Sequence, residues 1–350
     1  MSAASTLEAV KAYYGRVLQT NQDLKTSACC TAESLPAYLR PIESELHDEV
    51  REKFYGCGSP IPLSLKGATV LDLGCGSGRD TFLLSKLVGE TGRVIGVDMT
   101  AEQLATAERH RSYHAQKFGY STSNVRLVQA YIEDLAAAGI ESGSVDVVIS
   151  NCVINLSPDK RRVFAEIFRV LKPGGELFFS DVFAGRRVPA ALAADPLLLG
   201  ECLGGALYVE DFRRLLREVG CLDYRVVSSQ PIRLGDPDIE RRAGMIDFYS
   251  KTVRAFKLEL EDLCEDYGQV AYYLGTLPES PHQFMLDDHH LFKTGQPMLV
   301  CGNTAAMVGQ TRYREHFRVL GDQAVHYGPF PCAPAAASAA PGSAAGGACC

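Results

Sequence analysis

The stretch Val70-Leu-Asp-Leu-Gly-Cys-Gly-Ser-Gly-Arg79 indicates how this chain folds. A short apolar run ends in an acid and then in three alternating glycines, a pattern typical of a strand that breaks into a tight turn. The glycines allow backbone conformations closed to other residues and let a ligand approach the main chain closely. Their spacing lacks the later glycine of the dinucleotide fingerprint, so the motif does not match a nicotinamide site.

The acids near this motif indicate the chemistry of the ligand. Asp72 places a carboxylate, rather than a cation suited to phosphate, beside the glycines. We therefore expect a cofactor with hydroxyls and an amino acid moiety, which points to S-adenosylmethionine. Asp98 ends a second predicted strand, 93–98, twenty residues after Gly78. In an open α/β sheet, a carboxylate at that offset accepts hydrogen bonds from ribose hydroxyls.

Strands and helices alternate through this half of the chain. Further strands are predicted at 124–133, 144–152 and 176–181, and a helix runs from Ser157-Pro158 to Pro173-Gly174-Gly175. Thr100-Ala-Glu-Gln103 resembles a capping box that opens another helix. The pattern favours a doubly wound, mostly parallel α/β sheet of the Rossmann-like type, with the ligand at the carboxyl ends of the strands. The predicted cofactor-binding residues are Tyr55, Asp72, Gly74, Cys75, Gly76, Asp98, Met99, Ile132, Glu133 and Asn151.

Composition narrows the possible partners. The chain has 350 residues, a net charge of −7 and no apolar run long enough to span a membrane, so neither nucleic acid nor a membrane is expected as a partner. The first residues, Met1-Ser-Ala-Ala-Ser5, lack the pattern of a secretory signal. We therefore expect a cytoplasmic enzyme, and a monomer, with a small-molecule substrate.

Twelve cysteines are the second informative feature. In a reducing compartment, thiols are more often metal-binding, catalytic or buried than paired in disulfides. Three stand in unusual company: Cys57 lies between glycines, Cys152 ends the fourth strand and Cys202 precedes a glycine pair. If these thiolates converge at the mouth of the sheet, they would hold a soft, thiophilic element. Ordinary packing is the interpretation we give to Cys75, Cys221, Cys264 and Cys301, with Cys75 lining the cofactor by its backbone.

Seven segments together resemble the arsenite S-adenosylmethionine methyltransferase family of the class I methyltransferases. They are Lys25-Thr-Ser-Ala-Cys29, Tyr55-Gly-Cys-Gly58, Asp72-Leu-Gly-Cys-Gly-Ser-Gly-Arg-Asp80, Gly96-Val-Asp-Met-Thr100, Tyr131-Ile-Glu133, Ser150-Asn-Cys-Val-Ile-Asn-Leu156 and Gly200-Glu-Cys-Leu-Gly-Gly-Ala-Leu-Tyr208. The resemblance implies that Cys152 and Cys202 bind trivalent arsenic directly and that Cys57 is a further ligand. It also implies that Cys29 joins a thiol relay, although the neighbouring Cys30 leaves open which of the two does so.

The resemblance also implies a reaction. The lone pair of a thiolate-bound arsenic would attack the sulfonium methyl, so that positioning rather than a general base supplies the rate. Methylation formally oxidises arsenic, and Cys29 or Cys30 paired with Cys57 would return two electrons by exchange with glutathione or thioredoxin. The expected substrate is an adduct of trivalent arsenic with thiols, and methylation would serve detoxification.

The expected organisation has four parts: an N-terminal helix and thiol segment (1–36), the cofactor-binding domain with the arsenic ligands (37–225), a smaller α+β lid domain that supports the arsenic site (226–330) and a disordered Ala/Pro/Gly/Ser tail (331–350). Within the third part we expect short strands at 224–234, a charge-rich helix at 241–266 and a small sheet built from 269–275, 291–293 and 298–300. The tail ends in Cys349-Cys350, a candidate for arsenic capture.

Two other classes of function stay open on sequence alone. A methyltransferase of a sterol, quinone or phospholipid would share the glycine loop and both acids, but would not need Cys57, Cys152 and Cys202 together. A non-catalytic thiol-based metal binder would not need an intact cofactor motif, which is present here at Asp72 and Asp98.

Overall fold

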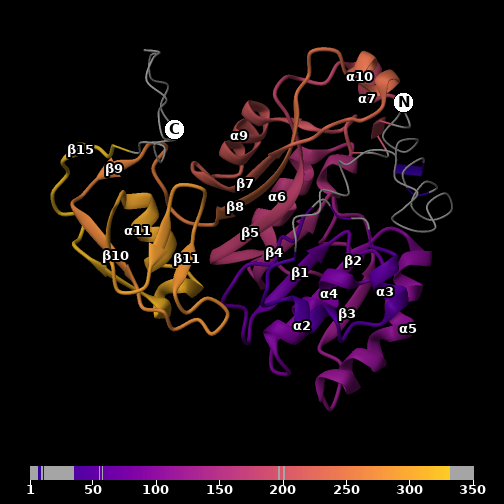
Figure 1. The fold of residues 1–350 in the computed structure, drawn as a ribbon, viewed down its shortest axis with the longest axis horizontal. Coiled ribbons are helices and arrows are strands. Elements are labelled where there is room, and N and C mark those ends of the chain that lie inside the picture. The colour runs from indigo at the N-terminus through magenta and orange to yellow at the C-terminus, as the bar shows by residue number, and fades with distance from the viewer. Residues whose placement is uncertain are drawn as a thin grey trace.

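A computed structural model describes residues 7–8, 11, 35–54, 56, 58–195, 198–199 and 202–331 (Figure 1). Several residues that the sequence singles out lie outside these ranges: Cys29, Cys30, Tyr55, Cys57, Cys349 and Cys350. The predictions for them stay predictions. Most of the predicted N-terminal thiol segment (1–36) and the tail after Pro331 lie outside as well.

The main sheet has eight strands, and its order is β3-β2-β1-β4-β5-β8-β7, with β6 paired to β5. The strands are β1 (Thr69–Leu73), β2 (Arg93–Asp98), β3 (Val125–Gln129), β4 (Val145–Asn151), β5 (Leu171–Ala184), β6 (Leu207–Tyr208), β7 (Tyr224–Pro231) and β8 (Phe248–Phe256). Strands β1 to β6 pair in parallel, whereas β8 is antiparallel to both β5 and β7. The predicted doubly wound, mostly parallel sheet is confirmed.

Helices cover both faces of this sheet (Figure 1). They are α2 (Arg40–Glu43), α3 (Asp48–Glu52), α4 (Arg79–Val88), α5 (Ala101–Phe118), η4 (Ile154–Leu156), α6 (Lys160–Val170), α7 (Ala190–Ala193), α9 (Val209–Glu218) and α10 (Pro237–Ala243). On β1, Leu71 packs into one apolar cluster with residues of α6 and α9, while the neighbouring Val70 packs into another with α4 and α5. This alternation follows from the two-residue period of a strand and explains why the central strands are apolar throughout.

Some local predictions differ from the structure. The Thr100 side chain makes no capping hydrogen bond to α5, so the predicted capping box is not formed. The backbone N–H of Thr100 instead donates to Asp98 at 2.8 Å. Strand β3 ends at Gln129, and Ile132 and Glu133 follow it in a turn rather than in the strand. The predicted helix before β5 begins at Lys160 and ends at Val170, and β5 already includes the glycines at 174 and 175.

The cofactor-binding domain and the lid domain were expected to meet at about residue 225. Two strands of the main sheet, β7 and β8, lie across and beyond this point. Residues 224–231 form one strand, β7, and β8 occupies 248–256. The helix predicted at 241–266 is therefore wrong, because the only helix there is the end of α10. Arg254 of β8 is a buried charge paired with Glu176, which explains how a charge-rich segment can run inside a sheet.

The remaining elements form a small α+β unit on the left of Figure 1. They are β9 (Glu265–Asp266), β10 (Gln269–Tyr273), β11 (Gln283–Met285), β12 (Leu291–Lys293), β13 (Pro297–Val300), α11 (Gly302–Gly309), η5 (Arg312–His316), β14 (Phe317–Leu320) and β15 (Gly328–Pro329). Strands β13, β10 and β14 form a three-stranded sheet, and β11 pairs with β12. The small sheet expected in this region is present.

The small unit meets the main sheet at Glu176. Its carboxylate accepts a hydrogen bond from Tyr313 at 3.0 Å and pairs with Arg312 at 2.5 Å. Glu176 lies opposite Val147, near the amino ends of β4 and β5. The described contacts of the small unit therefore lie at the end of the sheet away from the strand carboxyl ends.

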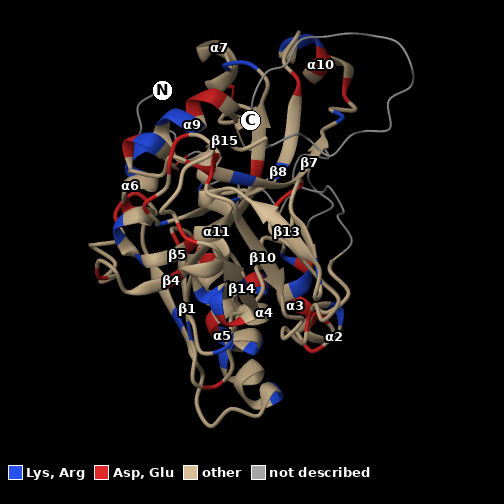
Figure 2. Cartoon of the chain, turned by 90° about the vertical axis from the view of Figure 1, so that its left-hand side faces the viewer, with Lys and Arg blue, Asp and Glu red and all other residues tan. Residues whose placement is uncertain are grey.

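Charged residues of both signs are spread along the outer helices, while the central strands carry few (Figure 2). Within the described residues, none of the helices is both long and apolar enough to cross a membrane.

Candidate active site

The glycine loop after β1 forms one wall of a cavity at the carboxyl ends of the strands. Gly74, Gly76 and Gly78 all have positive φ, at 68°, 52° and 93°. A Cβ at Gly74 would lie 2.2 Å from a methyl carbon of Val153, so only glycine fits there. The N–H of Gly76 donates to Asp98 at 2.9 Å, which ties the loop to the end of β2.

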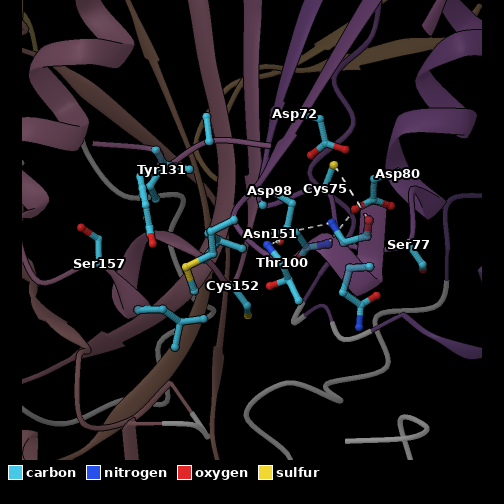
Figure 3. Close-up of a pocket in the computed structure, with 18 of the residues that line it drawn as sticks. Asp72, Cys75, Ser77, Asp80, Asp98, Thr100, Tyr131, Asn151, Cys152 and Ser157 are labelled. Carbon is cyan, nitrogen blue, oxygen red and sulfur yellow. Dashed lines mark hydrogen bonds between the residues drawn. The ribbon is translucent and has the colours of Figure 1, made fainter. Parts of the chain in front are cut away.

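The cavity contains most of the residues predicted to bind a cofactor, and Figure 3 shows several of them around it. Those that line it are Asp72, Gly74, Cys75, Gly76, Asp98, Met99, Ile132, Glu133 and Asn151. Tyr55, the remaining predicted residue, lies outside the described part of the chain. Cys152 also lines the cavity, so a cofactor held by the glycine loop would adjoin a sulfur atom.

Two carboxylates of the cavity are held in low-dielectric surroundings. Asp72 is 2% exposed and accepts a hydrogen bond from the Thr81 hydroxyl at 2.6 Å. Burial, together with the negative charge of nearby Asp80, raises the pKa of Asp72 to about 8. Burial also raises the pKa of Asp98, against the opposing effect of the backbone N–H donors of Thr100 and Gly76. A cationic ligand group is well placed to compensate these carboxylates.

Some cavity residues, among them Asp80 and Ser157, were not named from the sequence as site residues. The Asn151 amide donates to Asp80 and to the carbonyl of Gly58, both at 2.9 Å. Ser157 donates to the Glu133 carboxylate, which links the turn after β3 to the segment after β4. These residues orient the predicted cofactor ligands. Asp80 lies in the first turn of α4, after the glycine loop, and Ser157 ends the turn η4 that follows β4, and these positions were the available sequence signals.

A sulfur-rich centre lies beside the cavity. One ligand atom each from Cys152, Asp181 and Cys202 lies within 4.8 Å of the other two, and all three residues are buried. Cys202 donates from its sulfur to the carbonyl of Cys152 at 3.4 Å. The structure thus brings together two cysteines that stand fifty positions apart. Cys57, the third predicted ligand, lies outside the described residues.

Both cysteines have strained backbones. Among the described non-glycine residues, positive φ occurs at Cys152 (57°), Cys202 (61°) and Ser64. Such conformations cost about 1–3 kcal/mol each and persist where the surrounding structure holds them, often at functional sites. Close packing supplies that support here, since Gly205 lies so near Asn155 that a Cβ would meet its carbonyl oxygen at 1.9 Å.

Asp181 and Lys160 add charge to the sulfur centre. The Asp181 carboxylate accepts from the backbone N–H groups of Val182 at 2.8 Å and Asn155 at 3.1 Å. Burial nevertheless raises the pKa of Asp181 to about 7. Burial lowers the pKa of Lys160, against the attraction of Asp181 and Cys202. The sequence indicates Asp181 only as the end of a predicted strand. Its signal was the adjacency of β5 to β4, which carries Cys152 at its end.

Cys152 is disulfide-bonded in the structure, whereas Cys202 is not part of a disulfide. The sequence-based redox pair was Cys29 or Cys30 with Cys57, which all lie outside the described residues, and it did not include Cys152. Cys152 therefore has to be reduced before its sulfur can bind a ligand.

The residues that pack on this centre come from two stretches. They include Leu198, Leu199 and Leu203 from the segment before β6, and Ile232, Ile239, Ala243 and Phe248 from the region between β7 and β8. The part of the predicted lid that lies on the cysteines is thus 232–248, while the small unit packs at the other end of the sheet.

The sheet and the cavity define a class I S-adenosylmethionine-dependent methyltransferase, and residues 64–220 match the model of a methyltransferase domain. An arsenite methyltransferase of Aquipseudomonas alcaligenes is 53% identical to this chain, over 92% of this chain and 93% of the relative. The human arsenite methyltransferase is 41% identical, over 90% of this chain and 84% of its own. The crystal structure of an arsenic(III) S-adenosylmethionine methyltransferase from Chlamydomonas reinhardtii matches with a TM-score of 0.82 and 53% identity, over 85% of this chain and all of the other. The chain belongs to the arsenite methyltransferase family.

Proposed function

We propose that this enzyme transfers the methyl group of S-adenosylmethionine to trivalent arsenic held by Cys152 and Cys202, with Cys57 as a further ligand. The observation that carries the proposal is the convergence of two buried cysteines beside the cofactor cavity, with Cys152 lining both. Sulfur ligands select soft centres such as arsenic. The named relatives, one of which acts on arsenic(III), support the same substrate.

The reaction needs positioning more than acid–base chemistry. Thiolate-bound trivalent arsenic is pyramidal and keeps a lone pair, which attacks the sulfonium methyl. The arsenic–carbon bond forms, the carbon–sulfur bond breaks and S-adenosylhomocysteine leaves. Cys152 and Cys202 are 2% and 0% exposed, so the transfer takes place away from water. Orienting the two partners supplies much of the rate.

Two electrons must then return to arsenic, because methylation raises its oxidation state from three to five. A thiol reductant of the glutathione or thioredoxin type supplies them and is itself oxidised to a disulfide. The disulfide at Cys152 gives a second reason for a thiol reductant, since this disulfide has to be reduced by two further thiols before arsenic binds. Cys29 or Cys30 with Cys57 is the proposed relay, and Cys349-Cys350 a candidate for arsenic capture. Methylated arsenicals for detoxification, made in the cytoplasm, are the proposed products and setting.

The test is an arsenic speciation assay on the full-length protein with S-adenosylmethionine and glutathione. Cys152→Ser and Cys202→Ser should each abolish methylation of both arsenite and methylarsenite, because each removes a soft ligand from every substrate. Cys29→Ser or Cys57→Ser should spare part of the methylarsenite reaction, where carbon already occupies one position on arsenic. If Cys29 and Cys30 substitute for each other, the double variant is needed in place of Cys29→Ser.

Cys221→Ser is the matched control, because Cys221 is a buried free thiol in the core, just after the end of α9, and does not line the cavity. It should keep full activity. Equal loss of activity on both substrates in the variants of Cys29, Cys57, Cys152 and Cys202 would overturn the division between ligands and relay. Full activity of Cys202→Ser would overturn the arsenic site itself.

A further inference from the structure

Two stretches of backbone touch close to Cys202 in the chain. Gly205, three positions after Cys202, packs so tightly on Asn155 that a Cβ on Gly205 would lie 1.9 Å from the Asn155 carbonyl oxygen. Real Cβ atoms essentially never approach another atom within 3.0 Å, so a side chain at position 205 has to move a backbone. The φ angle of Gly205 is not positive, so this contact, rather than the conformation of its own backbone, requires glycine.

Asn155 is held in place by three hydrogen bonds. Its backbone N–H donates to the Asp181 carboxylate at 3.1 Å, and its side-chain amide donates to the carbonyl of Val182 at 2.6 Å. Its carbonyl, the group that meets Gly205, accepts from the Lys160 ammonium at 3.1 Å. Asn155 is fully buried, so any shift of this carbonyl leaves polar groups without partners away from water. Asn155 is therefore a firm support for the segment that rests on it.

The turn between Cys202 and β6 transmits the position of Gly205 to the cysteine. The N–H of Ala206 donates to the carbonyl of Leu203 at 3.2 Å, which closes this turn. The next two residues form β6, which pairs with β5. At the other end of the turn, the backbone of Cys202 is strained, with φ at 61°, and needs support from its surroundings. A displacement of Gly205 should therefore displace Cys202 as well.

The Cys202 sulfur lies beside Cys152 while the turn keeps this position. It donates to the carbonyl of Cys152 at 3.4 Å, and the two sulfurs belong to one group of possible ligand atoms that lie within 4.8 Å of one another. One arsenic atom can bind both sulfurs only when they are close enough for two bonds of ordinary length. A pair that is held at this separation before arsenic arrives avoids the cost of rearrangement on binding.

We propose that Gly205 and Asn155 are positioning residues for arsenic binding, because their backbone contact sets the separation of the Cys152 and Cys202 sulfurs. This role rests on the proposed function, in which both sulfurs bind arsenic. Neither Gly205 nor Asn155 lines the cofactor cavity. Loss of the contact should therefore weaken the use of arsenite while the affinity for S-adenosylmethionine stays the same.

Gly205→Ala in the full-length protein is the direct test. It should lower kcat/KM for arsenite by about ten- to a hundredfold, the size of effect that a misplacement of roughly 1 Å can have. The dissociation constant of S-adenosylmethionine, measured by calorimetry, should not change. Gly185→Ala is the matched control, because a Cβ on Gly185 would meet its nearest neighbour, the Asp247 carbonyl oxygen, at an ordinary 3.6 Å. The control should keep wild-type values of both quantities.

Phenylarsine oxide reports the separation of the sulfurs without methyl transfer. With the protein reduced by a phosphine, two arsenic–sulfur bonds form, the oxygen leaves as water with the two thiol protons, and arsenic stays trivalent. Trypsin releases Cys152 in peptide 127–160 and Cys202 in peptide 188–213, each with one cysteine. Mass spectrometry should find these peptides bridged by one phenylarsenic group in the wild type and in Gly185→Ala. The bridge should be depleted in Gly205→Ala.

Asn155→Ala is the second variant, since loss of the amide releases the Asn155 backbone from Val182. It should show the same pattern as Gly205→Ala, and it decides the question if circular dichroism shows that Gly205→Ala does not fold. A full bridge with wild-type kcat/KM in the folded variant would overturn the proposal. A parallel loss of cofactor affinity would also overturn it, because the contact would then support the fold in general. Full activity of Cys202→Ser would instead overturn the proposed function, so the two failures are distinguishable.

Discussion

The Asp72 carboxyl has a raised pKa because it is buried beneath the glycine loop. The folded protein therefore keeps this proton up to about pH 8, whereas the unfolded chain loses it near its ordinary pKa of 3.8. The free energy of unfolding should fall as the pH rises through that window, because the folded state binds more protons there. Asp72→Asn should remove this dependence and raise the free energy of unfolding at pH 8 by on the order of 1–3 kcal/mol.

Denaturant unfolding at pH 5 and pH 8 measures the effect, with Glu102→Gln as the control. Glu102 lies exposed at the start of α5, so its replacement should leave the pH dependence intact. S-adenosylmethionine should bind more weakly to Asp72→Asn, because its cationic groups favour the ionised form of Asp72 and an amide cannot ionise. A pH dependence unchanged from the wild type would show that Asp72 is ionised in the folded protein.

Asp98 has two functions in the site. It accepts from the N–H groups of Gly76 and Thr100, and it is the proposed acceptor for the ribose hydroxyls. Asp98→Ala should weaken the binding of S-adenosylmethionine by roughly 1–3 kcal/mol, because the ribose hydroxyls lose the carboxylate that accepts their hydrogen bonds. Titration calorimetry measures the change. Unaltered affinity would place the ribose elsewhere in the cavity.

At the scale of elements, α9 depends on one aromatic side chain. Phe212 is fully buried, and its ring lies 4.8 Å from that of Tyr224, 5.2 Å from Phe183 and 5.5 Å from Phe164. Phe212→Ala should lower the free energy of unfolding by about 3–5 kcal/mol, because removal of the ring leaves an empty space where α6, α9 and the sheet meet. Urea unfolding tests this, with the half-exposed neighbour in Arg213→Ala as control. A loss below 1 kcal/mol would mean that the neighbouring rings collapse into the space.

Element by element, the sequence predicts what depends on local pattern. The strands around Leu71 and Val148 were found because apolar runs flanked by glycines and acids are typical of buried parallel strands. Two errors come from tertiary contacts. The helix expected around Arg254 is a strand, because Glu176 from β5 compensates the buried guanidinium. The capping box at Thr100 does not form, and Asp98 from the preceding strand binds the Thr100 N–H.

At the scale of the whole molecule, the glycine loop, Asp72 and Asp98 could be placed from the sequence because they follow consecutive strands. The approach of Cys202 to Cys152 could not. It depends on a long excursion after β5 that returns over the end of β4, and residue spacing carries no information about that path.

The junction between the main sheet and the small unit should control stability without controlling cofactor binding. Glu176 is fully buried and pairs with Arg254 at 3.0 Å and Arg312 at 2.5 Å, at the end of the sheet opposite the cavity. Glu176→Gln keeps the shape but leaves two buried cations without their anion, which should cost about 3–5 kcal/mol. Glu279→Gln, on the exposed surface of the small unit, is the matched control.

Thermal unfolding and calorimetric titration with S-adenosylmethionine, made on the same samples below the unfolding range, separate the two effects. The midpoint should fall in Glu176→Gln and stay unchanged in Glu279→Gln, while both bind the cofactor with wild-type affinity. The cavity is built on β1, β2 and β4, and none of the residues that line it contacts Glu176 through a hydrogen bond or ion pair described here. A cofactor affinity that falls together with the midpoint would show that the small unit helps to shape the active site from the far end of the sheet.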